Sequence, residues 1–166
     1  LFEIKFLPGG VDVVTNKLIS ITFSTVSTNS TLINNVTPMT NIVSIIVKEK
    51  LDLLRDSGGI LSVSNVNSSS IIAESKNIVA NHFGVNSSDL SLDYIQNSND
   101  VLAKTSISII TTIKSIKNML NLTCGVTLTN DLIYSSFANQ ISLVSVFDLS
   151  VQLYIQTIMN NIINNN

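Results

Sequence analysis

The chain has 166 residues and a mass of 18.0 kDa, which fits one domain with a core large enough to fold without disulfides. Charged residues make up only 12% of it and the formal net charge is −2, which excludes the basic surface of a nucleic-acid-binding protein. The mean hydropathy is +0.41, but no apolar run approaches the roughly 18 residues of a membrane-spanning helix. We therefore expect a single domain over residues 1–166, with a Ser/Thr/Asn-rich surface and no membrane insertion.

Residues 1–36 are expected to form a β-rich segment. Apolar and charged residues alternate over 2–6, and Pro8-Gly9-Gly10 follows as a turn. Residues 18–26 are rich in β-branched side chains and alternate again, and Leu32-Ile33 is a further short strand candidate. Two or three strands do not make a stable sheet alone, so they are expected to pack on helices or to pair with a neighbouring module.

Residues 37–163 are expected to form a bundle of about five helices. Thr37 is a suitable N-cap, Pro38 suits the first helical position, and Gly58-Gly59 stops the helix. The expected buried face of this helix consists of Met39, Ile42, Val43, Ile46, Leu53 and Leu54.

The remaining helices follow from similar patterns. A second helix is expected from near Ser70 to a left-handed cap at Gly84, and a third from 97–100 to a point just before Gly125. Two more divide the stretch 129–163 near 145–148, and 164–166 is a polar tail. The buried stripe of the third helix is expected to contain Leu102, Ile107, Ile110, Ile113, Ile116, Met119 and Leu120. The core-facing residues of the fourth helix are expected to be Leu132, Ile133, Phe137 and Ile141. Those of the fifth helix are expected to be Leu149, Leu153, Ile155, Ile158, Met159 and Ile162. The predicted fold class is mainly α with a small N-terminal β element of two to three short strands.

One motif joins the two parts of the chain. Gly9, Gly10, Asp12 and Thr15 form a turn pattern, and the segment 31–40 holds a short strand and a helix start. With these residues, and with Phe83-Gly84 and Asp89-Leu90 further on, the chain resembles a helical module of large bacterial surface and secreted proteins, including adhesins of the repeats-in-toxin type.

This chain departs from the pattern of that module at several positions, and its helices carry Ser and Ile where members of the family carry Ala. Asn16-Lys17 stands where the family prefers Gly after Thr, Ser24-Thr25 replaces Ala-Pro, and Met39 replaces Leu. The bias toward Ile, Asn and Lys suits an AT-rich bacterial genome or a virus. The resemblance implies an extracellular or particle-surface setting, and it transfers no catalytic residues. Leu1 follows no visible signal peptide, so we expect a processed product or a fragment of a longer protein.

Histidine and cysteine each occur once, which limits the chemistry available. Because His82 is the single histidine and Cys124 the single cysteine, the chain cannot form a histidine pair, a multi-cysteine metal site or an internal disulfide. We expect His82 to lie near a helix C-terminus and Cys124 to be a small buried apolar residue.

Acidic residues and glycines give no site motif. Asp12 is expected to stabilise its turn, because no EF-hand loop or nonapeptide repeat surrounds it or the carboxylates of Glu74, Asp89, Asp93 and Asp100. Glu49 and Asp52 are expected on an exposed helix face. Gly58-Gly59 lacks phosphate-loop spacing, and no serine lies in Gly-x-Ser-x-Gly. We assign no catalytic, cofactor-binding or metal-binding residues and expect no cofactor.

Three functions remain open at this point. The leading hypothesis is a non-enzymatic structural or assembly module of an extracellular surface protein, filament or adhesin, which associates with itself or with neighbouring modules. A virion-surface or capsid-associated protein is the first alternative. A module that binds glycan or another cell-surface ligand is the second, with Tyr94, Tyr134 and Tyr154 as the ring-plus-hydroxyl candidates, although packing in or near the core is expected for each. The glycosylation sequons at Asn29, Asn35, Asn67, Asn86 and Asn121 are about as many as composition alone produces.

Overall fold

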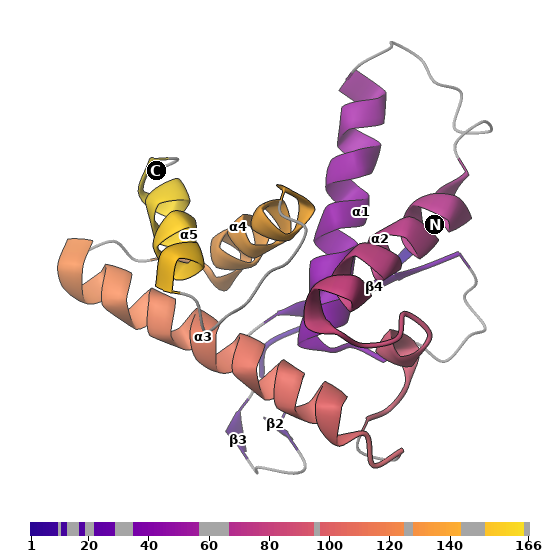
Figure 1. Ribbon diagram of the computed structural model, residues 1–166, viewed down its shortest axis with the longest axis horizontal. Coiled ribbons are helices and arrows are strands. Elements are labelled where there is room, and N and C mark those ends of the chain that lie inside the picture. Colours follow the sequence, from indigo (N-terminus) through magenta and orange to yellow (C-terminus); the bar gives the residue numbers. More distant parts are fainter. Residues whose placement is uncertain are drawn as a thin grey trace.

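The protein is a helical bundle with a small antiparallel β element at its N-terminal end (Figure 1). The computed structural model describes residues 1–9, 11–12, 17–18, 22–28, 35–56, 67–94, 97–124, 128–143 and 152–164. Five α-helices make up most of these residues, so the predicted fold class is confirmed. The strand expected at Leu32-Ile33, the helix stop at Gly58-Gly59 and the division near 145–148 lie outside the described residues.

The β element consists of two short antiparallel ladders. β1 (Phe2–Phe6) pairs with β4 (Phe23–Ser27), with Phe2 opposite Ser27 and Phe6 opposite Phe23. β2 (Val11–Asp12) pairs with β3 (Lys17–Leu18). The turn after β1 contains Gly9 at a φ of 108°, a conformation that L side chains rarely adopt. Within the stretch 18–26, where a strand is expected, Leu18 lies in β3, residues 23–26 lie in β4 and Thr22 belongs to neither strand, while residues 19–21 lie outside the described part of the chain.

The described helices are α1 (Pro38–Asp56), α2 (Ser68–Phe83), α3 (Asp100–Cys124), α4 (Asn130–Leu143) and α5 (Gln152–Asn164). A short 3-10 helix at Asp89–Ser91 lies between α2 and α3. Gly84 ends α2 at a φ of 65°, which confirms the predicted left-handed cap. α2 begins two residues before Ser70, the predicted start.

Side-chain caps explain where four of these helices begin. A Thr or Asn just before each helix accepts a hydrogen bond from a backbone N–H of the first turn, which satisfies a donor that the helix itself leaves unpaired. The donor and acceptor pairs are Thr40 N to Thr37 Oγ1 at 3.1 Å, Ser70 N to Asn67 Oδ1 at 3.1 Å, Leu102 N to Asn99 Oδ1 at 3.1 Å and Leu132 N to Thr129 Oγ1 at 3.4 Å. At the start of α1 the capping is reciprocal, because the backbone N–H of Thr37 donates to Thr40 Oγ1 at 2.8 Å.

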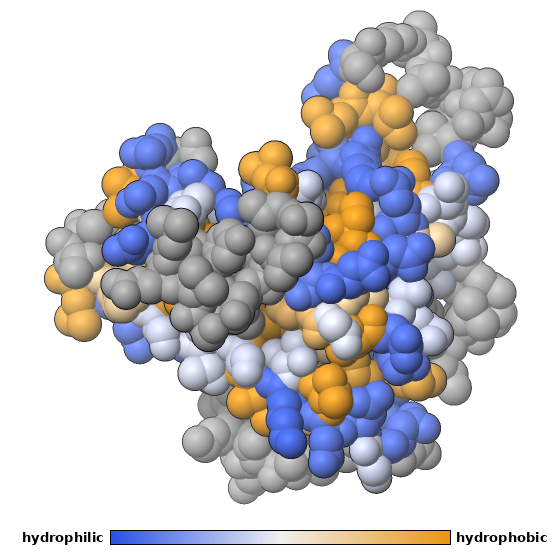
Figure 2. Space-filling model, viewed as in Figure 1, coloured by the Kyte–Doolittle hydropathy of each residue, from blue (hydrophilic) through white to orange (hydrophobic). Residues whose placement is uncertain are grey.

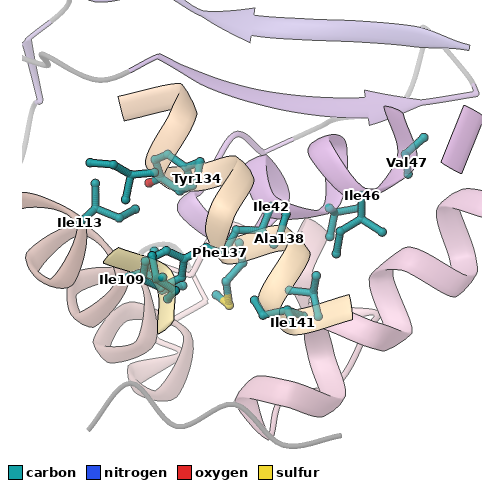
Figure 3. Close-up of a cluster of buried hydrophobic side chains, with 14 of the residues drawn as sticks. Ile42, Ile46, Val47, Ile109, Ile113, Tyr134, Phe137, Ala138 and Ile141 are labelled. Carbon is teal, nitrogen blue, oxygen red and sulfur yellow. The ribbon is translucent and has the colours of Figure 1, made fainter. Parts of the chain in front are cut away.

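The core forms where α4 packs against α1 on one side and α3 on the other (Figure 3). Tyr134 and Phe137 of α4 are fully buried there, and the ring of Tyr134 meets that of Phe23 edge to face, with centroids 6.1 Å apart. Burying each large apolar side chain contributes about 1.5–3 kcal/mol. This packing makes α4 the central helix of the bundle.

Four residues expected in the core are exposed instead. Leu53 and Leu54 lie near the end of α1 with 68% and 39% of their surface exposed, because this end projects beyond the other described helices (Figure 1). Ile107 and Met119 of α3 are 64% and 41% exposed. α3 contacts the bundle along one stripe, so apolar residues off that stripe face outward. In Figure 2, apolar surface accordingly covers the projecting end of α1. The expected core positions Leu149 and Leu153 have no described side chains.

Candidate functional site

Two surface features stand out among the described residues: a polar groove and an exposed apolar strand. The polar groove has a volume of about 270 Å³ and lies where β1, β4, α1 and α4 meet. Its lining residues are Glu3, Lys5, Thr22, Ser24, Asn41, Ser44, Ile45, Lys48, Glu49, Asp52, Asp131 and Ser135. Most of them carry a hydroxyl, an amide or a charge, so the groove offers hydrogen bonds and ionic contacts.

Helical spacing accounts for the floor of the polar groove. The lining residues of α1 recur every three or four positions from Asn41 to Asp52, which places them on one face of the helix. Asp131 and Ser135 are four residues apart on α4 and line the opposite side. The helical period that places apolar residues on one face of α1 also places these polar residues on another face. The other walls of the groove come from β1, β4 and α4, which are distant from α1 in the sequence or precede it.

Glu49 is the groove carboxylate most affected by its surroundings. It is half-buried, and this burial raises its pKa above the ordinary value for glutamate. The side-chain amide nitrogen of Asn139, in the orientation that satisfies both groups, donates to its two carboxylate oxygens at 2.9 and 3.1 Å. The expectation that Glu49 is an ordinary surface charge is therefore wrong. Asp52 is closer to that expectation, because it forms an exposed ion pair with Arg55 at 3.2 Å.

A buried amide fixes β4 against α1 beneath the groove. Asn41 Oδ1 accepts hydrogen bonds from the backbone N–H of Ser24 at 2.8 Å and from Ser24 Oγ at 3.1 Å. Both residues are buried, and an unmade hydrogen bond there would leave a desolvated polar group. Sequence reasoning missed this pair because 17 residues separate its members; the short Thr-Pro-x-Thr-Asn pattern of the helix start is the local signal that places Asn41 on the first turn.

A second cluster, also missed from the sequence, joins α2 to the short 3-10 helix. Lys76 Nζ donates to Ser91 Oγ at 2.7 Å, and Asn35 Nδ2 donates to the backbone carbonyl of Ser91 at 2.9 Å. Burial lowers the pKa of Lys76 from its ordinary value. An ion pair at 2.7 Å between Lys50 Nζ of α1 and Glu74 Oε1 of α2 connects α2 to a further element, α1. These contacts connect distant segments and assign structural roles to Lys76 and Glu74.

His82, Tyr94 and Tyr134 are not among the residues that line the polar groove. The imidazole Nδ1 of His82 is 2.8 Å from the carbonyl oxygen of Ile78, within the last turn of α2, which agrees with the expected helix-end position. Tyr134 is fully buried, as expected for core packing, and its burial raises its pKa well above the usual tyrosine range. Tyr94 is partly buried against the core. The side chains of Tyr154, Cys124 and Asp12 lie outside the described part of the structure.

The sequons occupy different environments. Asn67, Asn86 and Asn121 are exposed, whereas Asn35 is half-buried and uses its amide nitrogen in the bond to Ser91. Asn67 also caps α2. Asn29 lies outside the described residues. Because Asn35 is half-buried and the other three are exposed, Asn67, Asn86 and Asn121 are the sterically more open acceptors.

The described residues contain neither a metal-binding cluster nor a membrane-spanning helix. No group of three or more His, Cys, Asp or Glu side chains among them is arranged to hold a metal ion. None of the described helices combines the length and the hydropathy that a bilayer crossing requires.

The exposed apolar strand consists of Leu1–Leu7, here called the β1 strip. Every residue of β1 is exposed, including Phe2 at 51%, Ile4 at 38% and Phe6 at 40%, and the flanking Leu1 and Leu7 are 53% and 66% exposed. One edge of β1 pairs with β4; among the described residues no strand pairs with the other edge. The predicted strand is confirmed, but its apolar side is not covered by described helices.

Comparisons of this chain with protein-family models, with curated proteins and with solved structures find no match.

Proposed function

We propose that this chain is a non-enzymatic structural module of an extracellular surface protein, filament or adhesin, and that it assembles with copies of itself or with neighbouring modules. The observation that carries the proposal is the β1 strip. Its apolar side chains are exposed on a strand with an open outer edge among the described residues. Such an edge is a template for pairing with another chain, and a large exposed apolar patch marks an interaction surface.

Composition supports the same proposal. Only 12% of the residues are charged, and much of the polar surface is made of Ser, Thr and Asn. Neutral polar groups cost less to bury in a contact between subunits than ions do, and close copies of this chain repel each other little. The non-enzymatic part rests on the sequence, which has a single histidine and a single cysteine and none of the common nucleophile motifs.

The extracellular placement rests on the resemblance of the Gly9-to-Thr40 stretch to modules of bacterial surface proteins. A virion-surface or capsid-associated role is compatible with the same features, because an exposed apolar strand requires only a neighbouring subunit. The neighbouring genes distinguish these settings. Flanking immunoglobulin-like repeats in the same reading frame indicate an adhesin, whereas a cluster of capsid genes indicates a virion protein.

Self-association is measured by sedimentation velocity over a wide concentration range, together with electron microscopy of concentrated samples. We expect the mean sedimentation coefficient to rise with concentration and ordered assemblies to form. A chain that stays monomeric at every concentration and forms no ordered assembly contradicts the proposal.

The polar groove favours ligand binding as a second candidate function. It combines hydroxyl, amide and charged side chains in one hollow, although no aromatic residue is among those that line it, so a sugar would bind there without ring stacking. If a glycan binds in the groove, the Lys48→Gln variant should no longer bind it on a glycan array. The Tyr94→Ala variant, which changes a residue outside the groove, should bind it as wild type does. Equal binding by all three proteins, or none by the wild type, contradicts this function.

A further inference from the structure

The β1 strip is nearly the same when it is read in either direction. Residues 1–7 are Leu-Phe-Glu-Ile-Lys-Phe-Leu, and reversal exchanges only Glu3 and Lys5. In an antiparallel pairing, residues that lie directly opposite each other share one face of the sheet. Two copies of this strip that pair about Ile4 therefore place each residue opposite one of like hydropathy, or opposite one of opposite charge.

Each contact in that pairing is complementary. Leu1 faces Leu7 of the second copy, and Phe2 faces Phe6 of the second copy, so both ends of the strip are apolar. Glu3 faces Lys5 of the second copy and Lys5 faces its Glu3, which gives two cross-strand ion pairs. Aromatic pairs and opposite charges are among the side-chain pairs that stabilise antiparallel strands.

Other registers place like charges opposite each other, or place a charged side chain opposite an apolar one. Moving the pairing by two residues in one direction sets Glu3 opposite Glu3, and in the other direction sets Lys5 opposite Lys5. Moving it by one residue sets charged side chains opposite phenylalanine or isoleucine. A parallel pairing in register opposes like charges at both positions. Charge complementarity thus selects one antiparallel register.

The structure presents the strip in a conformation ready for this contact. β1 is already extended and hydrogen-bonded to β4, so little backbone entropy is lost on pairing. Lys5 Nζ lies 3.3 Å from Glu3 Oε2, which shows that the two charges share one face, and their side chains are 54% and 46% exposed. Because the pair is exposed, exchanging it for pairs with a second copy costs little.

We infer that the partner of the β1 strip is a second copy of this chain, joined through antiparallel β1 strands with Ile4 at the two-fold axis. The β1–β4 ladders of the two copies then become one four-stranded sheet in the order β4, β1, β1, β4. This inference rests on the proposed assembly function and specifies its partner and its geometry. The contact is isologous, because the same surface is used by both copies.

Charge reversal in the full-length chain tests the register. Glu3→Lys places two lysines in the strip and Lys5→Glu places two glutamates, so each variant repels itself in the inferred pairing. We expect each variant to self-associate at least about tenfold more weakly than wild type. Mixing the two variants restores association, because every lysine then faces a glutamate. The double variant Glu3→Lys with Lys5→Glu should associate like wild type. Circular dichroism verifies that each variant is folded.

Cysteine cross-linking provides an independent measurement in a Cys124→Ser background. Ile4→Cys faces itself across the axis and should form a disulfide-linked dimer under mild oxidation, because disulfides need Cα atoms within about 7 Å. Phe2→Cys is the matched control, since its two copies are offset by about four residues, or roughly 13 Å. An equal mixture of Phe2→Cys and Phe6→Cys should cross-link.

The outcomes separate this inference from the proposed function. The β1 pairing is overturned if the charge reversals leave self-association unchanged, or if Phe2→Cys alone cross-links as fast as Ile4→Cys. Assembly would then use another surface. A wild type that remains monomeric overturns both. Weak association of each single variant, with recovery in the mixture and in the double variant, supports the inferred dimer.

Discussion

β1 and β4 are strands of equal length in the same ladder, yet they lie in opposite environments. Four of the five residues of β4 are buried, among them two serines and a threonine, whereas all five residues of β1 are exposed, among them two phenylalanines and an isoleucine. The hydropathy of the two strands would predict the reverse. Position in the bundle decides the burial, because β4 packs on α1 and β1 lies on its outer side.

The largest expected difference comes from placing the same charge on each strand. Val26→Asp buries an unpaired carboxylate in β4 and should lower the free energy of unfolding by about 3–5 kcal/mol. Ile4→Asp in β1 leaves its carboxylate in water and should change the free energy of unfolding by about 1 kcal/mol or less. Urea unfolding of dilute protein, followed by circular dichroism, measures both. Equal losses would show that the two strands do not differ in burial.

The same contrast occurs within one helix. Ile109 of α3 is fully buried and Ile107 is 64% exposed, although both are isoleucines two residues apart. Ile109→Ala should cost about 2–5 kcal/mol through lost apolar contact and the cavity that remains. Ile107→Ala should stay within about 0.5 kcal/mol of wild type. Thermal and urea unfolding of the pair measure this, and a costly Ile107→Ala would mean that another surface covers that face.

Removing the buried amide tests what holds β4 in place. Asn41→Ala leaves the backbone N–H of Ser24 and its hydroxyl without their acceptor, which should cost about 1–3 kcal/mol. Asn81→Ala, an exposed asparagine of α2, is the matched control and should have little effect. Hydrogen exchange at Ser24 adds a local measurement. Unchanged protection of Ser24 in Asn41→Ala would contradict the anchoring role.

A smaller effect is expected where α1 begins, next to β4. Thr37→Ala removes the side-chain acceptor for the backbone N–H of Thr40 and should cost about 1 kcal/mol. Thr111→Ala, at an exposed position of α3, controls for the loss of a threonine side chain and should be nearly neutral. A comparison of their denaturation midpoints decides the matter, and equal midpoints would remove the capping explanation.

The smallest effect concerns the groove beside the two strands and depends on pH. Burial raises the pKa of Glu49, so the folded protein binds this proton more tightly than the unfolded chain does. The resulting stabilisation is present below the unfolded pKa and is lost as pH rises through the folded pKa. Wild type should therefore gain stability relative to Glu49→Gln as pH falls from neutral into the acid range. Asp56→Asn, at the exposed end of α1, controls for the loss of a surface charge, and a pH-independent difference would contradict the assignment.

Most of the helical architecture follows from local patterns. The N-cap at Thr37 and the left-handed glycine at Gly84 each depend on a few neighbouring residues, so both can be recognised without the fold. The first strand is likewise predicted by its alternation and by the turn at Gly9. These features hold because hydrogen bonding within a turn or a cap depends on near neighbours.

The groove and the strand environments could not be predicted in the same way. The groove brings together residues that are far apart in the chain, from Glu3 to Ser135. Glu49 reads as a surface charge in the sequence, and only packing against α4 buries it and brings Asn139 to it. The bond from Ser24 to Asn41 is also a long-range contact. Pattern reasoning has no access to such contacts, because they depend on how the helices are arranged in space.

By itself, the sequence determined the mainly α class, the starts of α1, α3 and α4, the glycine cap that ends α2 and the existence of β1, because caps, turns and periodicity are short-range. It also contains the near-symmetric strip Leu1–Leu7. Only the tertiary structure decided that β4 is buried, that β1 and Ile107 are exposed and that Glu49 lies in a groove. The physical reason is that burial is a property of the neighbours an element finds in space, and an amphipathic pattern states which face can be buried without stating what will cover it.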